Sequence, residues 1–176
     1  MKSVNESVVN PMREIQIEKV IINMSVGKSG EPLERAKKVL AQLSNQKVCT
    51  RQAKNTIKDF GIRKGEPIAC LVTLRKDNAI DFLKKALEAI ENKLKTSRFD
   101  EFGNFSFGIK EHIDIPGTKY VPELGIIGMD VIVTLKRRGY RVKRKKIRKS
   151  SVGSNHLISK KEAIGFIQKN FGTSIA

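Results

Sequence analysis

The feature that most constrains this 176-residue chain is a dense run of positive charge near its C-terminus. Ten of the fourteen residues from Lys136 to Lys149 are Lys or Arg, and no acid lies among them. Such a run repels itself and is not expected to fold alone. We expect a moderately basic folded body over residues 1–135 and a basic C-terminal arm over residues 136–176.

The chain as a whole is strongly cationic, with a net charge of +17. Residues 136–176 hold 13 Lys and Arg but one acid, Glu162, so twelve of the seventeen net charges lie in the arm. A protein with this imbalance needs an anionic partner, and nucleic acid is the usual one. The candidate phosphate-neutralising residues of the arm are Arg137, Arg138, Arg141, Lys143, Arg144, Lys145, Lys146, Arg148 and Lys149.

Apolar periodicity predicts both helices and strands in the body. Leu33, Ala36 and Leu40 recur at helical spacing behind Pro32, which suits the first turn of a helix. A second helix is expected over residues 78–95, with Asp77 as its cap. The expected strands are residues 15–24, 46–50, 68–75, 105–109 and 130–136, behind an extended lead-in at residues 1–13.

Three local patterns carry more detailed expectations. The first strand alternates at Ile15 and Ile17 and then becomes apolar on both faces, which predicts a central strand. The alternating Phe105 and Phe107 are assigned to the core rather than to base stacking. Ser159 and Glu162 have the spacing of a capping box, so a short docked helix is expected after them. The two cysteines, Cys49 and Cys70, are expected to be buried thiols in a reducing cytosol.

Residues 51–75 form the candidate specific contact region. They combine six Lys and Arg with two glycines and the aromatic Phe60, and they lead into the strand at 68–75. A basic loop held on a strand suits contact with phosphates and bases. A solvated hairpin would have a similar composition, and the residues alone leave both interpretations open.

The sequence offers no enzyme site. Gly27-Lys28-Ser29 resembles the end of a nucleotide-binding loop, but Ile22 stands where that motif needs its first glycine. The two cysteines and two histidines lack paired metal-ligand spacing. Glu111 and His112 are neighbours, and neighbours on a strand face opposite ways, so they cannot form a relay. No cofactor, metal or catalytic residue is therefore expected.

Membrane insertion is not expected either. No apolar run approaches the ~20 residues that a membrane span needs, and the polar N-terminus has no secretory apolar region. With few aromatics and no RNP1 pattern, recognition of folded RNA by shape and backbone fits best. The alternative is a stand-alone basic RNA or DNA chaperone without sequence specificity.

Four segments make the sequence more specific. NPMREIQIEKVIINMSVG, TRQAKNTIKDFGIRKGEPIACLVTLR, GNFSFGIKEHIDIPG and GIIGMDVIV follow one another in order. They closely resemble the ribosomal protein L5 family, the 5S-rRNA-binding proteins of the large subunit, over roughly residues 10–133. The basic ending resembles the archaeal and eukaryotic branch, and the later helix resembles archaeal members.

The resemblance implies an α+β fold in which an antiparallel β-sheet has its helices packed on one face, with residues 136–176 as a basic extension. It implies a cytoplasmic, ribosomal protein that binds 5S rRNA and attaches it in the central protuberance. The implied further partners are 23S-type rRNA, the elbow of the P-site tRNA, and other proteins of the central protuberance and the small subunit, with which it would form a bridge.

The resemblance also implies individual contact residues. Those for rRNA are Asn23, Gln46, Arg51, Phe60 and Thr73. Those for tRNA, in the loop from Ala53 to Gly65, are Lys54, Asn55, Arg63 and Lys64. Packing roles remain alternatives: Phe60 as a loop residue, Asn23 as a strand-end cap and Thr73 as an ordinary strand threonine. Asn45 replaces a glycine common in the family, and we expect it to keep the turn because Asn tolerates a positive φ.

Overall fold

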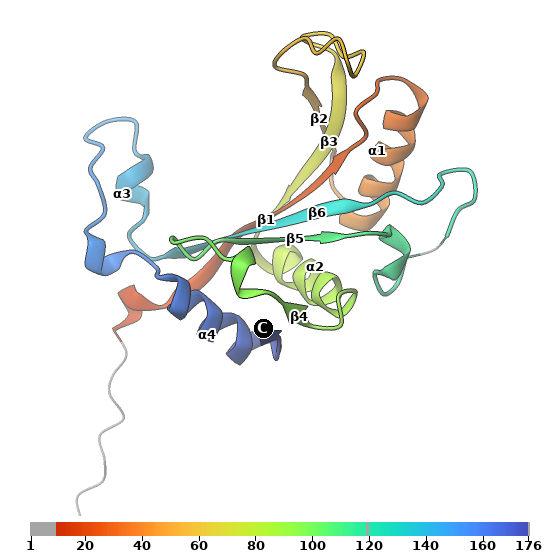
Figure 1. Ribbon diagram of the computed structural model, residues 1–176. Helices are drawn as coiled ribbons and strands as arrows, with labels where there is room; N and C mark the ends of the chain where they lie inside the picture. The colour runs from red at the N-terminus through yellow and green to blue at the C-terminus, as the bar shows by residue number, and fades with distance from the viewer. Residues whose placement is uncertain (1–9, 119, 176) are drawn as a thin grey trace, which may run out of the picture.

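The computed structural model describes residues 10–118 and 120–175 and centres on one antiparallel sheet (Figure 1). The strands are β1 (Ile15–Ser25), β2 (Cys49–Gln52), β3 (Pro67–Leu74), β4 (Lys93–Leu94), β5 (Phe105–Ile109), β6 (Met129–Arg137) and β7 (Ser174–Ile175). The helices are α1 (Glu31–Ser44), α2 (Lys76–Glu88), α3 (Arg141–Arg144) and α4 (Lys160–Phe171), and short 3₁₀ turns are η1 (Pro11–Arg13), η2 (Thr96–Arg98), η3 (His112–Asp114) and η4 (Ser154–His156). The expected extended lead-in at residues 1–13 lies outside the described residues up to Val9, and η1 replaces it after Asn10.

The main sheet has the order β2-β3-β1-β6-β5, and every neighbouring pair is antiparallel. β1 lies in the middle, as its apolar sequence predicts. A separate two-stranded parallel pair, β4 with β7, joins the C-terminal end of the chain to the segment after α2. The α+β class and the antiparallel sheet are confirmed.

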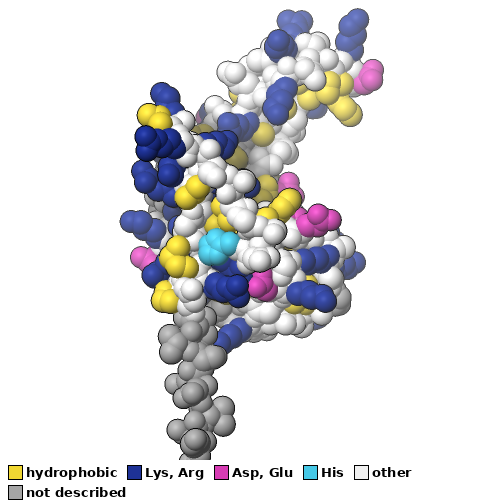
Figure 2. Space-filling view, turned by 90° about the vertical axis from the view of Figure 1, so that its left-hand side faces the viewer, with side chains coloured by type: hydrophobic (Ala, Val, Ile, Leu, Met, Phe, Trp, Pro, Cys, Tyr) yellow, Lys and Arg dark blue, Asp and Glu magenta, His cyan; other side chains and the backbone are white. Residues whose placement is uncertain are grey.

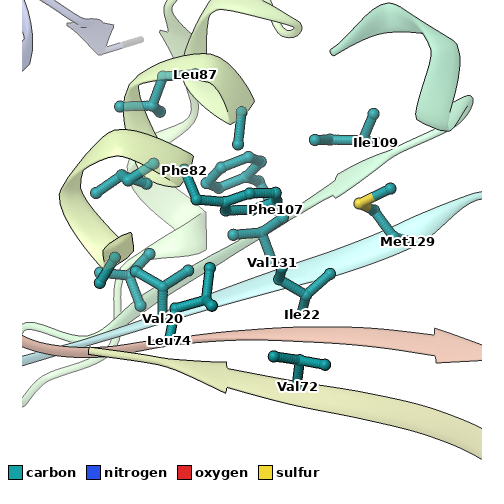
Figure 3. Close-up of a cluster of buried hydrophobic side chains, with 14 of the residues drawn as sticks. Val20, Ile22, Val72, Leu74, Phe82, Leu87, Phe107, Ile109, Met129 and Val131 are labelled. Atoms are coloured by element: carbon teal, nitrogen blue, oxygen red, sulfur yellow. The ribbon is translucent and has the colours of Figure 1, made fainter. Parts of the chain in front are cut away.

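One face of this sheet is buried and the other is open. Alternate residues of β1, β3, β5 and β6 point into a single core that also takes in the apolar sides of α1, α2 and α4. Figure 3 shows the sheet side of this cluster, where Ile22, Val72 and Val131 come from three adjacent strands and lie near Phe82 of α2. α1 packs against β3 and α2 against β1. The helices therefore leave the opposite face of the sheet exposed.

A β-bulge at Glu18 decides which residues of β1 reach the core. The pairing with β6 steps from Ile17↔Leu135 to Lys19↔Thr134, so Glu18 is an extra residue on β1. Before the bulge the odd-numbered residues pair with inward residues of β6, and after it the even-numbered ones are buried. The run from Val20 onward is therefore a shift in the alternation and not a strand with two hydrophobic faces.

The second helix differs from its prediction at both ends. Arg75 and not Asp77 is the N-cap, and Asp77 lies inside the first turn, where its charge favours the helix dipole. The helix ends at Glu88 rather than near residue 95, because Glu91 and Asn92 both take left-handed φ values, 56° and 54°. Leu94 is still buried, but as part of β4.

Of the remaining expectations, the capping box is confirmed, and the burial of the two cysteines is confirmed for one of them. Ser159 and Glu162 form the predicted capping box, and α4 buries Ala163 and Ile167. Cys70 is buried, which raises the pKa of its thiol to about 11, whereas Cys49 is exposed because β2 is an edge strand with all four residues exposed. No helix within residues 10–118 and 120–175 is long and apolar enough to cross a membrane.

Candidate nucleic-acid interface

The open face of the sheet presents polar groups, among them the exposed Asp130 opposite Asn23, on a half-exposed apolar background. Thr73 pairs with Ile21 across β3 and β1, and Asn23 pairs with Leu71 two residues further along the same pair. All four side chains are partly exposed. The Asn23 amide donates to the Ser25 hydroxyl at 3.0 Å, a contact along β1 on this same face. The two predicted rRNA contacts Asn23 and Thr73 therefore lie on one surface.

Between β2 and β3 the chain extends into a tip, residues 53–65, called the hairpin tip below. Main-chain hydrogen bonds close it at two levels: Ala53 N–H to Glu66 O at 2.8 Å, and a reciprocal pair between Ile57 and Ile62 at 2.9 and 3.1 Å. A turn from Lys58 to Gly61 forms its end, with Gly61 at φ 66°. The tip is a hairpin with its own hydrogen bonds.

A carboxylate locks the base of the hairpin tip. Glu66 accepts from the Ser29 hydroxyl, which belongs to the β1–α1 connection, and from the Arg63 N–H at 3.0 Å. The Ser29 hydroxyl, followed by the Arg63 N–H and the Arg63 charge, lowers the pKa of the Glu66 carboxyl below its usual value. Ser29 and Glu66 were not among the sequence-based candidates. They tie the hairpin to the sheet without contributing a cation.

The predicted tRNA contacts gather on this tip. Lys54, Asn55, Arg63 and Lys64 are all exposed there, and Phe60 is 71% exposed in the terminal turn. Thr73 lies six residues past the start of β3, about 20 Å along the strand from the hairpin base. The structure therefore groups Phe60 with the cations of the tip and not with Asn23 and Thr73.

The other two predicted rRNA contacts lie apart from the open face's centre. Gln46 is half-buried in the α1–β2 connection, just after Asn45, whose φ of 50° ends α1 as predicted for a residue that tolerates the left-handed region. Arg51 is exposed on the edge strand β2. Both are accessible from the β2 side of the molecule.

The basic arm begins inside the fold. β6 continues to Arg137, which is 5% exposed. Its guanidinium donates to Glu162 at 2.7 Å and to the carbonyl oxygens of His156 and Leu157 at 3.3 and 3.2 Å. Arg137 thus joins β6 to α4. Its expected role in neutralising phosphate does not fit this burial, because its charge is already paired inside the protein.

The other eight candidate phosphate-neutralising residues lie within residues 138–150, called the basic loop below. Eight Lys and Arg and no acid lie in it, and all eight are exposed. The loop is built on α3, and Ser150 N–H closes it by donating to Val142 O at 3.3 Å. Arg144 is half-exposed and reaches back to the bulged Glu18, whose side chain is 6% exposed, with one nitrogen on each carboxylate oxygen. Glu18 and Arg144 are 126 positions apart, and no pattern in the sequence indicates that they pair.

Seen together, the cations occupy two projections. Figure 1 shows the hairpin tip and the α3 loop rising from opposite ends of the sheet, away from α2 and α4. Figure 2 shows Lys and Arg side chains on both projections, and further charged side chains on the body below them. The sheet face between them is largely polar and apolar but includes Asp130, which pairs with Asn23, and Lys19, which pairs with Thr134. Two cationic projections beside such a face can neutralise backbone phosphates at the sides of a ligand whose shape is read at the centre.

Two side chains that could be reactive lie at or near this surface: the exposed thiol of Cys49 on β2 and the ring of His112. His112 is buried, accepts the Ile127 N–H at its Nδ1 at 3.3 Å, and has its pKa lowered by burial. Residues 10–118 and 120–175 contain no group of three or more His, Cys, Asp or Glu side chains placed to hold a metal ion. The arrangement suits binding.

Comparison with known proteins places this architecture in one family. Residues 10–63 match the model of ribosomal protein L5, and residues 67–166 match the model of the C-terminus of the same ribosomal family. The large ribosomal subunit protein uL5 of Pyrobaculum aerophilum is 52% identical over 166 residues, 94% of this chain and 93% of that protein. The uL5 of Nitrosopumilus maritimus is 48% identical over 172 residues, 98% of this chain and 99% of that protein. The chain belongs to the ribosomal protein L5 family.

Proposed function

We propose that this protein is a non-enzymatic constituent of the large ribosomal subunit that binds 5S rRNA and helps to attach it in the central protuberance. Membership of a family of ribosomal proteins supports the ribosomal role. The single observation that carries the RNA-binding role is the open sheet face between two cationic projections. Within the described residues, no helix or strand covers that face. Its partly exposed apolar and polar side chains are therefore free to contact RNA.

The mechanism is positioning. Asn23 and Thr73 hydrogen-bond or pack against folded 5S rRNA and set its register on the sheet, with Gln46 and Arg51 extending this surface at the β2 edge. The exposed cations neutralise the surrounding phosphates, which supports affinity but carries little sequence information. Contacts between neutral groups and folded RNA then supply selectivity.

The hairpin tip serves a second RNA in this proposal. It presents Lys54, Asn55, Arg63 and Lys64 on a scaffold locked by Glu66, with the exposed ring of Phe60 at its end. This geometry suits the backbone and a stacked base of the P-site tRNA elbow. A bridge to the small subunit and contacts with 23S-type rRNA and neighbouring ribosomal proteins complete the set of partners that the family resemblance implies.

Filter binding of the full chain to 5S rRNA, tRNA and a random RNA duplex across a salt series tests the first step. We expect 5S rRNA to bind most tightly, with a preference that persists at high salt. Thr73→Ala should weaken 5S binding by roughly 5- to 30-fold, equivalent to about 1–2 kcal/mol, with an unchanged salt slope. Lys143→Gln is the comparison, a single substitution that removes one exposed charge. It should instead lower the slope of log affinity against log salt concentration by about one.

Equal affinity for all three RNAs at high salt would contradict the proposal and favour a basic RNA or DNA chaperone without specificity. The tRNA step is tested separately with Phe60→Ala and Lys64→Gln, which should weaken tRNA binding and leave 5S binding through the open face intact. Loss of 5S affinity in Phe60→Ala would instead assign the ring to the 5S site.

A further inference from the structure

The basic loop carries an apolar side chain where a purely electrostatic arm would have none. Ile147 is 76% exposed, the largest exposed fraction among the large hydrophobic side chains within residues 10–118 and 120–175. Lys145 and Lys146 precede it, and Arg148 and Lys149 follow it. Arg148 has a φ of 52°, in the left-handed region that residues other than glycine rarely adopt. A strained residue beside an exposed isoleucine is typical of a contact site.

The loop is held in place before any ligand binds. Arg144 grips both carboxylate oxygens of Glu18, which the β-bulge in β1 places at the sheet. The Tyr140 hydroxyl accepts the Ile158 N–H at 3.1 Å and donates to His156 O at 3.3 Å, so the start of the loop is tied to the segment before α4. Ile147 is therefore displayed from a fixed support, which lowers the ordering cost of binding.

The chemistry around Ile147 selects its partner. The minor groove of an RNA duplex is wide and shallow, exposes ribose and base edges, and is bordered by phosphates on both sides. Apolar side chains enter minor grooves in many nucleic-acid-binding proteins while cations hold the flanking backbone. Single-stranded RNA would instead require stacking. The aromatic residue of this loop, Tyr140, contacts the His156 ring edge-on at 5.9 Å and has its hydroxyl engaged.

We propose that the basic loop is a preformed reader of duplex RNA in which Ile147 packs into the minor groove. Lys145, Lys146 and Lys149 contact phosphates on either side of the groove, and Glu18 acts as a positioning residue through Arg144. The proposal rests on the proposed function only in taking RNA as the partner. It is independent of which RNA occupies the open face of the sheet.

The test measures fluorescence anisotropy of the full chain with an RNA duplex of about 16 base pairs, which offers successive minor grooves. The same sequence as DNA duplex and as single-stranded RNA serves for comparison. Ile147→Asn should weaken binding to the RNA duplex about tenfold at every salt concentration, because it removes an apolar contact and no charge. Ile126→Asn, a matched change at an isoleucine that is 55% exposed before β6, should have no effect. Lys146→Gln should lower the salt slope by about one.

The positioning role of Glu18 can be tested by a substitution for which net charge alone predicts the opposite change in duplex affinity. Glu18→Gln raises the net charge by one, so a non-specific polycation would bind the duplex more tightly. Loss of the support should instead weaken binding several-fold. Glu34→Gln makes the same charge change and likewise frees an ion-paired cation, Lys37, but on α1, and it should not weaken binding. Arg144→Lys keeps the net charge, and the side chain it replaces is half-exposed. It should weaken duplex binding because lysine cannot donate to both carboxylate oxygens of Glu18 as arginine does.

Several outcomes would overturn the proposal. Unchanged duplex affinity in Ile147→Asn would exclude insertion, and an equal loss with DNA duplex and single-stranded RNA would exclude the A-form minor groove. If the protein bound anionic phospholipid vesicles through Ile147 and did not bind the duplex, the basic loop would be assigned to a membrane surface. The preference for 5S rRNA over tRNA is measured by filter binding, and the role of Ile147 by anisotropy with a duplex. The proposed function and this inference can therefore fail separately.

Discussion

The hairpin tip and the basic loop are both cationic projections, but different interactions hold them in shape. The hairpin tip is closed by its own main-chain hydrogen bonds, and Glu66 at its base accepts from the Ser29 hydroxyl of the body. The basic loop is tied to the body by Arg144 and Tyr140 and begins beside the buried Arg137. The hairpin tip can therefore open without disturbing the core, whereas the base of the basic loop is part of the core. Substitutions at the base of the basic loop should therefore change global stability, and substitutions in the hairpin tip should change local order.

Arg137→Ala should have the largest effect on stability. It removes a buried guanidinium that joins β6 to Glu162 and two carbonyl oxygens, and it leaves a cavity. We expect the free energy of unfolding to fall by about 3 kcal/mol. Urea denaturation measures this. Arg138→Ala is the matched control, because Arg138 is half-exposed with a 3.6 Å contact to Glu14 and should change stability by less than about 0.5 kcal/mol. Equal effects of the two substitutions would show that the loop's base is not part of the core.

The buried state of Arg137 was readable in principle from the sequence. Met129, Val131, Val133 and Leu135 alternate, and the same alternation places residue 137 on the buried face. The ten Lys and Arg of residues 136–149 obscured this alternation, because the whole run was expected to be exposed to solvent. Strand periodicity is the better guide here, since a strand keeps its alternation until a bulge or turn ends it.

Two glycines extend the comparison to backbone strain. Gly139 (φ 91°) turns the chain out of β6, and Gly61 (φ 66°) forms the end of the hairpin tip. Alanine is strained at either position by about 1–2 kcal/mol. For Gly139→Ala we expect most of that cost in global unfolding, because the turn joins β6. For Gly61→Ala we expect faster amide hydrogen exchange in the tip and a smaller global change.

Urea denaturation and hydrogen exchange followed by mass spectrometry separate these results. Gly165→Ala is the control, because Gly165 lies inside α4 with open space around its Cα and no positive φ. It should stabilise the protein by roughly 0.5–1 kcal/mol. If Gly61→Ala lowers global stability as much as Gly139→Ala, then the hairpin tip does not open independently of the core.

Local and long-range features differ in how far the sequence reveals them. The capping box of Ser159 and Glu162 and the left-handed Asn45 follow from neighbouring residues, and both predictions are confirmed. The bulge at Glu18 leaves a local trace, since the inward apolar residues shift from odd to even positions across it. Its partner Arg144 leaves none, because the pair forms only when the whole sheet brings β1 beside the basic loop.

Acid should weaken the basic-loop side of the molecule through Glu162. The Ser159 N–H, with further contributions from the Arg137 and Ser159 side chains, holds the pKa of this carboxyl below its ordinary value. A depressed pKa in the folded state stabilises the protein above the unfolded pKa of about 4.3, and this stabilisation is lost as pH falls through the folded value. Wild type should be more stable than Glu162→Gln at pH 7, and the difference should shrink below about pH 4. Thermal unfolding between pH 3 and 7 measures it, and a constant difference would contradict the assignment.

Ser29→Ala should have the smallest effect, and it tests the hairpin side directly. The substitution removes the hydroxyl that contributes most to the lowered pKa of Glu66, so that pKa should rise toward its usual value in an NMR titration. Global stability should change by less than about 0.5 kcal/mol, because Glu66 keeps its bond from the Arg63 N–H and the main-chain ladder persists. The tip would then keep its internal structure but lose its fixed angle to the sheet. In that state tRNA binding should weaken while 5S binding at the open face does not, since the hairpin tip takes part in the first contact alone.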